Sequence, residues 1–220
     1  MGRPLAVGVL ASGQGTTLEG LARAAEAEPD RFRVVVLISD RAGAPVIDRA
    51  RSHEIPTEVV LVRGQPPDEW ASRVTEALAR HGVELVVLAG FLPIFPPSWV
   101  ERWQGRAVNT HPALLPRFGG RGMYGRRVHE AVIAAGERES GATVHLVTRE
   151  VDQGPSIAQA RLPVLPGDTP DTLRERLRPV EIGLLVATVR RFAAGELPLP
   201  YPGGDEPART DRAAEPSRER

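Results

Sequence analysis

Two polar residues in an apolar stretch have the types and spacing to stabilise a developing negative charge. Asn109 and His111 are separated by one residue within the segment 107–116, so their side chains project to the same face of an extended chain. An amide N–H and an imidazole N–H on one face could both donate to an oxyanion that forms on a substrate carbonyl. Taken alone, the pair is also consistent with a structural role, in which Asn109 caps a turn and His111 packs inside the protein.

Asp152 is the acidic residue that best complements this pair. It follows an apolar segment that ends near Thr148 and precedes a Gly-Pro pair, which places it on a turn at the end of a strand. A carboxylate near His111 would favour the imidazolium form and could relay a proton from an attacking amine. Asp is also common before Gly in ordinary turns, so the local sequence leaves both roles open. His145 alternates with apolar residues, and we expect it to support the site.

Other residue types limit the chemistry further. Cysteine and lysine are both absent, which excludes a thiolate nucleophile, a Cys-bound zinc, a Schiff-base lysine and a P-loop lysine. We expect His53, His81 and His129 at the surface or at helix ends. No two histidines have an H-x-H or H-E-x-x-H spacing, so we predict no metal site.

A glycine-containing turn near the N-terminus is a candidate anion site. The segment 11–18, Ala-Ser-Gly-Gln-Gly-Thr-Thr-Leu, lies between a predicted strand and a predicted helix, where free backbone N–H groups and the helix dipole attract anions. A dinucleotide fingerprint would need glycine where the chain has Leu18. The segment therefore suits a single phosphate held by Gly15, Thr16 and Thr17, or a tight turn that binds nothing.

The elements that must position these residues alternate between short apolar strands and amphipathic helices. This alternation predicts a Rossmann-like, doubly wound α/β fold with a mostly parallel sheet, whose binding residues follow the carboxyl ends of strands. We expect buried strands over 5–11, 33–39 and 85–89, a strand nearer the edge over 57–62, and helices over 17–27, 45–52, 68–81 and 126–135.

The C-terminal part of the chain has a different pattern. The segments 142–148 and 156–162 alternate polar and apolar residues on either side of a turn, which predicts an extended β-hairpin. A long C-terminal helix should begin after the N-cap Thr169. Pro179 lies inside its pattern and should kink or break it just before Glu181.

Composition sets broad limits on organisation and partners. The 28 basic and 28 acidic residues balance, which gives no general attraction to nucleic acid or to an anionic membrane, so we expect small-molecule substrates. No apolar run approaches the roughly 20 residues that span a bilayer, and we find no signal-peptide pattern, so we expect a cytoplasmic protein. From about Tyr201 apolar residues nearly disappear, which predicts one domain over 1–200 and a disordered polar tail over 201–220. The sequence does not decide between a monomer and a homodimer.

Several longer stretches, taken together, resemble the folate-dependent formyltransferases. They are Asn109-Thr-His-Pro-Ala-Leu-Leu-Pro116, Gly141-Ala-Thr-Val-His145 and Val151-Asp-Gln-Gly-Pro155. The turn Ser12-Gly-Gln-Gly-Thr-Thr17 and the strand end Leu88-Ala-Gly-Phe-Leu92 are similar to the phosphoribosylglycinamide formyltransferases within that family. The resemblance extends from Leu5 to about Pro198, and its ordered motifs favour functional over structural roles for the residues above.

The resemblance implies formyl transfer from the cosubstrate 10-formyltetrahydrofolate to the amine of glycinamide ribonucleotide, a step of purine biosynthesis, without a metal. The catalytic residues that it implies are Asn109, His111 and Asp152, with His145 in support. The implied contacts to the ribonucleotide are Gly15, Thr16 and Thr17 for the phosphate, and Glu181 and Arg178 for the ribosyl and glycinamide groups. The implied folate pocket is formed by Leu92, Pro93, Ile94, Phe95, Asn109, Thr148, Arg149, Glu150, Val151 and Asp152.

The chain also departs from the family pattern, and other functions remain as alternatives. Pro93 stands where many members carry Arg, which affects the contacts to the folate tail more than the transfer chemistry. Methionyl-tRNA formyltransferases have a second C-terminal domain and formyltetrahydrofolate deformylases an additional N-terminal one, and we expect neither here. A dehydrogenase-like nucleotide-binding module would use Asp40 for a ribose, but the glycine spacing disfavours it. A non-catalytic binding protein is disfavoured because all three catalytic positions are filled.

Overall fold

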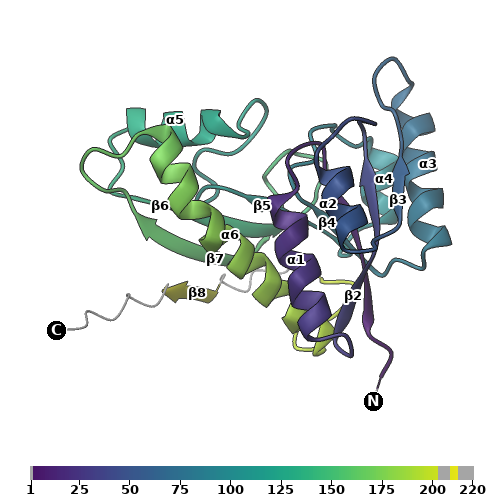
Figure 1. The fold of residues 1–220 in the computed structure, drawn as a ribbon. Coiled ribbons are helices and arrows are strands. Elements are labelled where there is room, and N and C mark those ends of the chain that lie inside the picture. The colour runs from purple at the N-terminus through teal and green to yellow at the C-terminus, as the bar shows by residue number, and fades with distance from the viewer. Residues whose placement is uncertain (1, 203–208, 213–220) are drawn as a thin grey trace.

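A computed structural model describes residues 2–202 and 209–212, which form one sheet with helices on both faces (Figure 1). The strand order in the sheet is β3-β2-β1-β4-β5-β6-β7-β8. The strands are β1 (Leu5–Leu10), β2 (Phe32–Ser39), β3 (Thr57–Val59), β4 (Leu85–Leu88), β5 (Ala107–His111), β6 (Glu139–Leu146), β7 (Ser156–Pro163) and β8 (Arg209–Arg212). The helices are α1 (Thr16–Ala27), α2 (Val46–Ser52), α3 (Pro67–Arg80), α4 (Pro97–Arg102), α5 (Arg126–Ala134) and α6 (Pro170–Ala193).

The strand pairing confirms the predicted Rossmann-like, doubly wound fold. β1 pairs in parallel with β2 and β4, and β4 pairs in parallel with β5. β6 runs antiparallel to both β5 and β7, and with β7 it forms the predicted extended hairpin. The chain order of the strands reverses between β1 and β4, which is the place where open α/β sheets bind their ligands.

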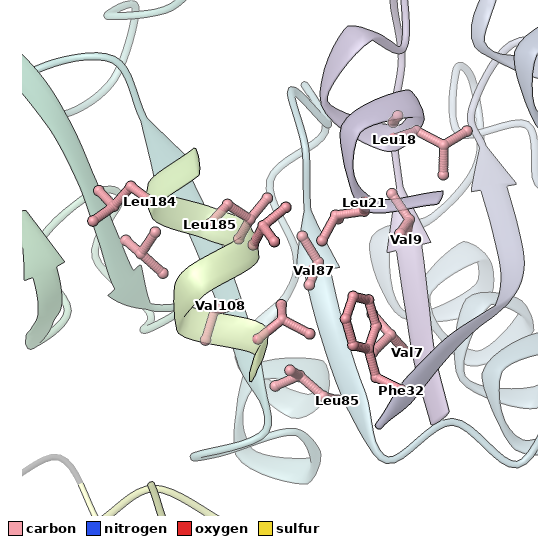
Figure 2. Packing of buried hydrophobic residues seen from close by; sticks show 14 of the residues in the cluster. Val7, Val9, Leu18, Leu21, Phe32, Leu85, Val87, Val108, Leu184 and Leu185 are labelled. Atoms are coloured by element: carbon pink, nitrogen blue, oxygen red, sulfur yellow. The ribbon is translucent and has the colours of Figure 1, made fainter. Parts of the chain in front are cut away.

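Apolar side chains pack on both faces of the sheet and hold β1, β4 and β5 in place. On one face, Val9 and Val87 of the sheet meet Leu21 of α1 and Leu185 of α6 (Figure 2). On the other face, Leu10 belongs to a second cluster formed with aromatic side chains of α3 and α4. Strands that are covered on both faces need apolar side chains in both directions, which explains the continuous Val-Ile-Leu runs of the sequence.

Two of the shorter elements differ from expectation. The edge strand β3 ends at Val59 instead of residue 62, and it lies at the edge of the sheet as predicted. Helix α4 was not expected at all, because its six residues are too few to show a helical period. Pro96 is its N-cap and Pro97 its first residue, and Trp99 and Val100 are buried against α3 and the sheet.

The C-terminal helix α6 does not break at Pro179. Thr169 caps it as predicted, since its Oγ1 accepts the backbone N–H of Thr172 at 3.2 Å. Pro179 removes one helical hydrogen-bond donor, but Leu177 and Leu184 on either side of it are buried, and this burial keeps both halves in one helix. Neither α6 nor any other described helix combines the length and apolar character needed to cross a membrane.

The predicted disordered tail over 201–220 needs correction where the structure describes it. Tyr201 is buried, its backbone N–H donates to the Gly105 carbonyl at 2.7 Å, and its ring packs edge-on against Phe192. Arg209–Arg212 forms β8, which pairs in parallel with β7. The backbone N–H and C=O groups of an edge strand can pair with a segment of any composition. The low apolar content of the tail therefore does not exclude a strand there. Residues 203–208 and 213–220 lie outside the described residues.

Candidate active site

A cavity of about 550 Å³ opens at the carboxyl ends of β1, β4 and β5. Its walls are the turn after β1, the segment after β4, the end of β5, the loop before α5, the β6–β7 turn and one side of α6. The structure brings together at this cavity every residue assigned to the site from the sequence except Arg149. Arg149 is exposed and forms an ion pair with Glu101.

The strand β5 delivers both Asn109 and His111 to the cavity, as their spacing predicts. Thr110 between them lies on the other side of the pleat, and its hydroxyl donates to Oε1 of Glu181 at 3.1 Å. The strand that carries Asn109 and His111 is therefore linked to α6 through Thr110. Thr110 was not assigned to the site, because its partner lies 71 positions away in the sequence.

The side-chain amide of Asn109 has two neighbours inside the protein. Its Nδ2 lies 3.0 Å from Nε2 of His145 and 3.4 Å from Oδ1 of Asp152. Nδ1 of His145 lies 2.9 Å from the carbonyl oxygen of Leu146, which can only accept, so Nδ1 carries the proton. Nε2 of His145 faces both the Asn109 amide and Oδ1 of Asp152, which lies 3.5 Å away, so His145 contacts two of the three candidate residues.

The imidazole of His111 also faces protein groups on both sides. Its Nε2 lies 2.8 Å from the carbonyl oxygen of Phe118 and donates to it. Its Nδ1 lies 3.5 Å from Oδ2 of Asp152, which is longer than a typical hydrogen bond. The same Oδ2 accepts the backbone N–H of Gly120 at 3.0 Å. Asp152 is thus beside His111 as expected. It also holds the loop 118–125 before α5, most of which lines the cavity and which we call the covering loop.

Burial determines the protonation of His111. Its side chain is 5 % exposed, and this desolvation lowers its pKa although the Asp152 charge and the Phe118 carbonyl both act to raise it. The expectation that Asp152 keeps His111 cationic is therefore wrong for this arrangement. Burial would raise the pKa of Asp152, but its contacts with His145, His111 and the backbone N–H of Gly120 outweigh burial and lower that pKa.

The turn after β1 has the backbone geometry of an anion site. Gly15 is the N-cap of α1 with φ 77°, a left-handed conformation that glycine adopts without strain. In the part of the chain that the structure describes, the backbone N–H groups of residues 14–17 have no protein acceptor. The hydroxyl of Ser12 accepts the backbone N–H of Leu92 at 3.0 Å and joins this turn to the segment after β4.

Glu181 lies at the far wall of the cavity, on α6. Burial raises the pKa of its carboxyl group, and the hydrogen bond from Thr110 and the charges of Arg174 and Arg178 offset only part of that effect. Arg174 also lines the cavity, although the sequence did not single it out. It lies one helical turn before Arg178, and this i, i+4 spacing is the signal that could have identified it.

His129 corrects the expectation that it lies at the surface or at a helix end. It lies within α5, is 2 % exposed and lines the cavity. Burial, followed by the charge of Arg174, lowers its pKa to about 4. The helical pattern of α5 could have indicated this, since Val128 and Val132 on the same side are buried as well. His53 and His81 follow the last residues of α2 and α3, as expected.

Comparisons with known proteins agree with this arrangement. The family model described as formyl transferase matches residues 5–189. A phosphoribosylglycinamide formyltransferase of Mycobacterium tuberculosis is 41% identical over 191 residues, which are 86% of each chain. The solved structure of glycinamide ribonucleotide transformylase 1 from Symbiobacterium toebii superposes with a TM-score of 0.83 at 35% identity and covers 90% of this chain and 91% of that one.

Some relatives are longer than this chain. The trifunctional purine biosynthetic protein adenosine-3 of Gallus gallus is 37% identical over 190 residues, which are 86% of this chain but 18% of that protein. The chain likewise spans about half, 54%, of the chloroplastic phosphoribosylglycinamide formyltransferase of Arabidopsis thaliana. The family match covers most of the sheet and the site-bearing segments after β1, β4, β5 and β6. The chain belongs to the formyl transferase family.

Proposed function

We propose that this chain transfers the formyl group of 10-formyltetrahydrofolate to the amine of glycinamide ribonucleotide, giving N-formylglycinamide ribonucleotide and tetrahydrofolate. The observation that carries this proposal is the shared cavity, which joins a phosphate-type turn to an amide, an imidazole and a carboxylate. The names of the relatives that match this chain over most of their length support the choice of acceptor. We place the reaction in the cytoplasm and expect small-molecule partners and no metal.

The formyl carbon is the centre that the three polar residues would serve. The amine attacks it directly, a new C–N bond forms, and the carbonyl oxygen becomes an oxyanion. Asn109 and His111 would donate N–H groups to that oxygen, which stabilises the transition state more than the planar formyl group. Collapse of the intermediate then breaks the bond from the formyl carbon to N10 of the folate.

Both donors must exchange partners for this step. The amide of Asn109 is close to His145 and Asp152, and Nε2 of His111 donates to the Phe118 carbonyl. Catalytic hydrogen bonds commonly tighten only when the substrate is bound, and the two donors would turn to the oxyanion at that stage. The low pKa of His111 means that its neutral ring, through the N–H at Nε2, would be the donor.

Asp152 would move the proton that the transfer leaves on the attacking nitrogen. Its lowered pKa keeps the carboxylate ionised near neutral pH, which is the form that accepts a proton. It would take the proton from the amine, directly or through water, and deliver it to N10 of the folate. The proton lost by the attacking nitrogen is then the one gained by N10, and no protein residue is acylated.

The remaining walls would bind the two substrates on opposite sides of these residues. The turn with Gly15, Thr16 and Thr17 would hold the phosphate, and Glu181 and Arg178 would contact the ribosyl and glycinamide groups. The pterin would lie between the segments 92–95 and 148–152. Leu92 and Ile94 are 43 % and 49 % exposed beside the cavity, and their apolar side chains suit contact with the flat face of that ring.

The direct test is an assay with each substrate supplied and withheld. We expect tetrahydrofolate to form only when both glycinamide ribonucleotide and 10-formyltetrahydrofolate are present, and the rate to be unchanged after treatment with EDTA. Equal consumption of the formyl folate without any amine would instead identify a deformylase. Loss of activity with EDTA and recovery with zinc would contradict the metal-free mechanism.

A further inference from the structure

Helix α2 holds the carbonyl groups of the turn after β1. The backbone N–H of Val46 donates to the Gly13 carbonyl oxygen at 3.1 Å. Nε of Arg49 donates to the Gln14 carbonyl oxygen at 2.7 Å, across 35 positions of the sequence. The terminal nitrogen Nη1 of the Arg49 guanidinium forms an ion pair with Glu19, on the first turn of α1.

These contacts decide where the N–H groups of the turn point. In a planar trans peptide the carbonyl oxygen and the N–H of the next residue point in opposite directions. When the carbonyls of Gly13 and Gln14 are turned toward α2, the N–H groups of Gln14 and Gly15 are turned away from it. The turn lines the cavity, and among the described residues α2 contributes none to that lining.

Arg49 is suited to this task by the shape of its side chain. The guanidinium has donors in a fixed fork, so Nε can hold a carbonyl while the terminal nitrogens hold a carboxylate. Glu19 has 24 % of its side chain exposed and also accepts from Arg23 at 2.6 Å. Arg49 contacts the turn through the Gln14 carbonyl oxygen and its charge is paired with Glu19, so we expect its effect on a bound anion to be geometric.

We infer that Arg49 is a positioning residue for the phosphate of the ribonucleotide: it acts through the Gln14 carbonyl and directs backbone N–H groups of the turn into the cavity. This inference rests on the proposed function, which places the phosphate at that turn. It adds a residue on α2 that touches neither substrate. It also explains why a turn without lysine and with an incomplete glycine fingerprint can hold an anion.

The test compares Arg49→Ala with Arg51→Ala. Arg51 lies on the same helix, is exposed and pairs with Asp48 three residues away, so its variant controls for the loss of a surface charge on α2. We expect Arg49→Ala to raise the KM for glycinamide ribonucleotide about tenfold, with kcat and the KM for the folate within about twofold of wild type. Inorganic phosphate should compete with the ribonucleotide, and its inhibition constant should rise by the same factor.

A substrate without the phosphate separates positioning from damage to the fold. Glycinamide riboside should be a poor substrate for the wild type, and its kcat/KM should be the same for Arg49→Ala, because no phosphate is present to lose its donors. An equal loss with riboside and ribonucleotide would mean that Arg49 is merely structural and would overturn the inference. A ribonucleotide KM within about twofold of wild type would overturn it as well.

A milder variant keeps the inference testable if Arg49→Ala does not fold. Glu19→Gln retains the Arg49 side chain and weakens its anchor, so the ribonucleotide KM should rise about threefold without a change in kcat. An unchanged KM in this variant would count against the inference. Equal use of riboside and ribonucleotide by the wild type would instead refute the phosphate subsite itself, and that failure is visible before any variant is made.

Discussion

His111 donates from Nε2 to the carbonyl oxygen of Phe118 across 2.8 Å. This contact satisfies a ring nitrogen that is buried, and it occupies the donor that the proposed transfer assigns to the oxyanion. The loop that contains Phe118 is held in turn by Asp152, which accepts the N–H of Gly120. His111 and Asp152 therefore lie at the proposed chemistry and also hold the covering loop. Changes to either residue should affect kcat more than the KM of either substrate.

The first prediction concerns the charge of Asp152. Asp152→Asn keeps the shape of the side chain, and its carbonyl oxygen can still accept from Gly120, but the proton acceptor is lost. We expect kcat to fall by roughly 10²–10⁴ while both KM values change far less. The midpoint of thermal unfolding should match that of the parent or lie slightly above it, since functional charges are commonly held at some cost in stability.

A combination of variants checks that Asp152 and His111 act together. His111→Ala should be similarly inactive, and the double variant should be no worse than the more damaged single one, because the two serve one step. Single-turnover rates would measure this without interference from product release. Turnover of Asp152→Asn within a factor of about three of wild type would reduce Asp152 to an ordinary turn residue.

The second prediction concerns Thr143, which holds the segment after His111. Its hydroxyl donates to the Ala113 carbonyl at 2.7 Å and accepts the Leu115 N–H at 3.1 Å, and the residue is fully buried. Thr143→Val removes these two bonds and a third, donated by the side-chain amide of Gln159 at 3.0 Å, without changing the shape, so the free energy of unfolding should fall by about 1–3 kcal/mol. We expect kcat to fall as well, because the segment between β5 and the covering loop loses the hydrogen bonds that fix its position.

Thr188→Val provides the matched control for Thr143→Val. Thr188 is also buried, but among the described residues its hydroxyl bonds only the Leu184 carbonyl within α6, four residues earlier. That carbonyl lies inside a helix and keeps a backbone partner, so the loss should be about 1 kcal/mol or less, with no effect on kcat. Denaturant unfolding measures both variants, and equal losses would show that Thr143 is not a special anchor.

The third prediction compares alanine substitutions at Gly13 and Gly15, two glycines of the turn after β1. A Cβ on Gly15 would meet the Cα of Val46 at 2.8 Å, and φ 77° is strained for any other residue. Gly15→Ala should therefore destabilise the fold by about 1–3 kcal/mol, whatever the turn binds. A Cβ on Gly13 meets nothing within 4 Å, so Gly13→Ala should fold like the parent. Similar unfolding midpoints for the two variants would contradict this account.

The fourth prediction concerns stability at mildly acidic pH. The pKa of His129 is lowered from 6.5 to about 4, first by burial and then by Arg174. Unfolding restores the ordinary pKa, so between pH 6.5 and about 4 the unfolded chain binds the extra proton more tightly, and the folded state loses stability as the pH falls. His129→Gln should lose less stability over this range, and unfolding midpoints at pH 7 and 4.5 measure the difference. Parallel curves for the two proteins would show that His129 does not titrate in this way.

The sequence by itself determined the fold class and the edge of the sheet at which the cavity lies. Continuous apolar runs over β1, β2 and β4 require strands covered on both faces, and a parallel sheet of such strands puts its site at their carboxyl ends. The alternation of a β-strand placed Asn109 and His111 on one face. Thr169 ahead of Pro170 predicted the start of α6. All of these follow from patterns within a few residues, which a linear sequence displays directly.

The tertiary structure alone decided what those residues face. Burial, which depends on every neighbour, outweighs the effect of Asp152 on the pKa of His111, and the packing of α5 puts His129 in the cavity wall. Arg49 meets Gln14 across 35 positions, and Thr110 meets Glu181 across 71. Such contacts depend on how helices pack against the sheet, and no local period of the sequence records that packing.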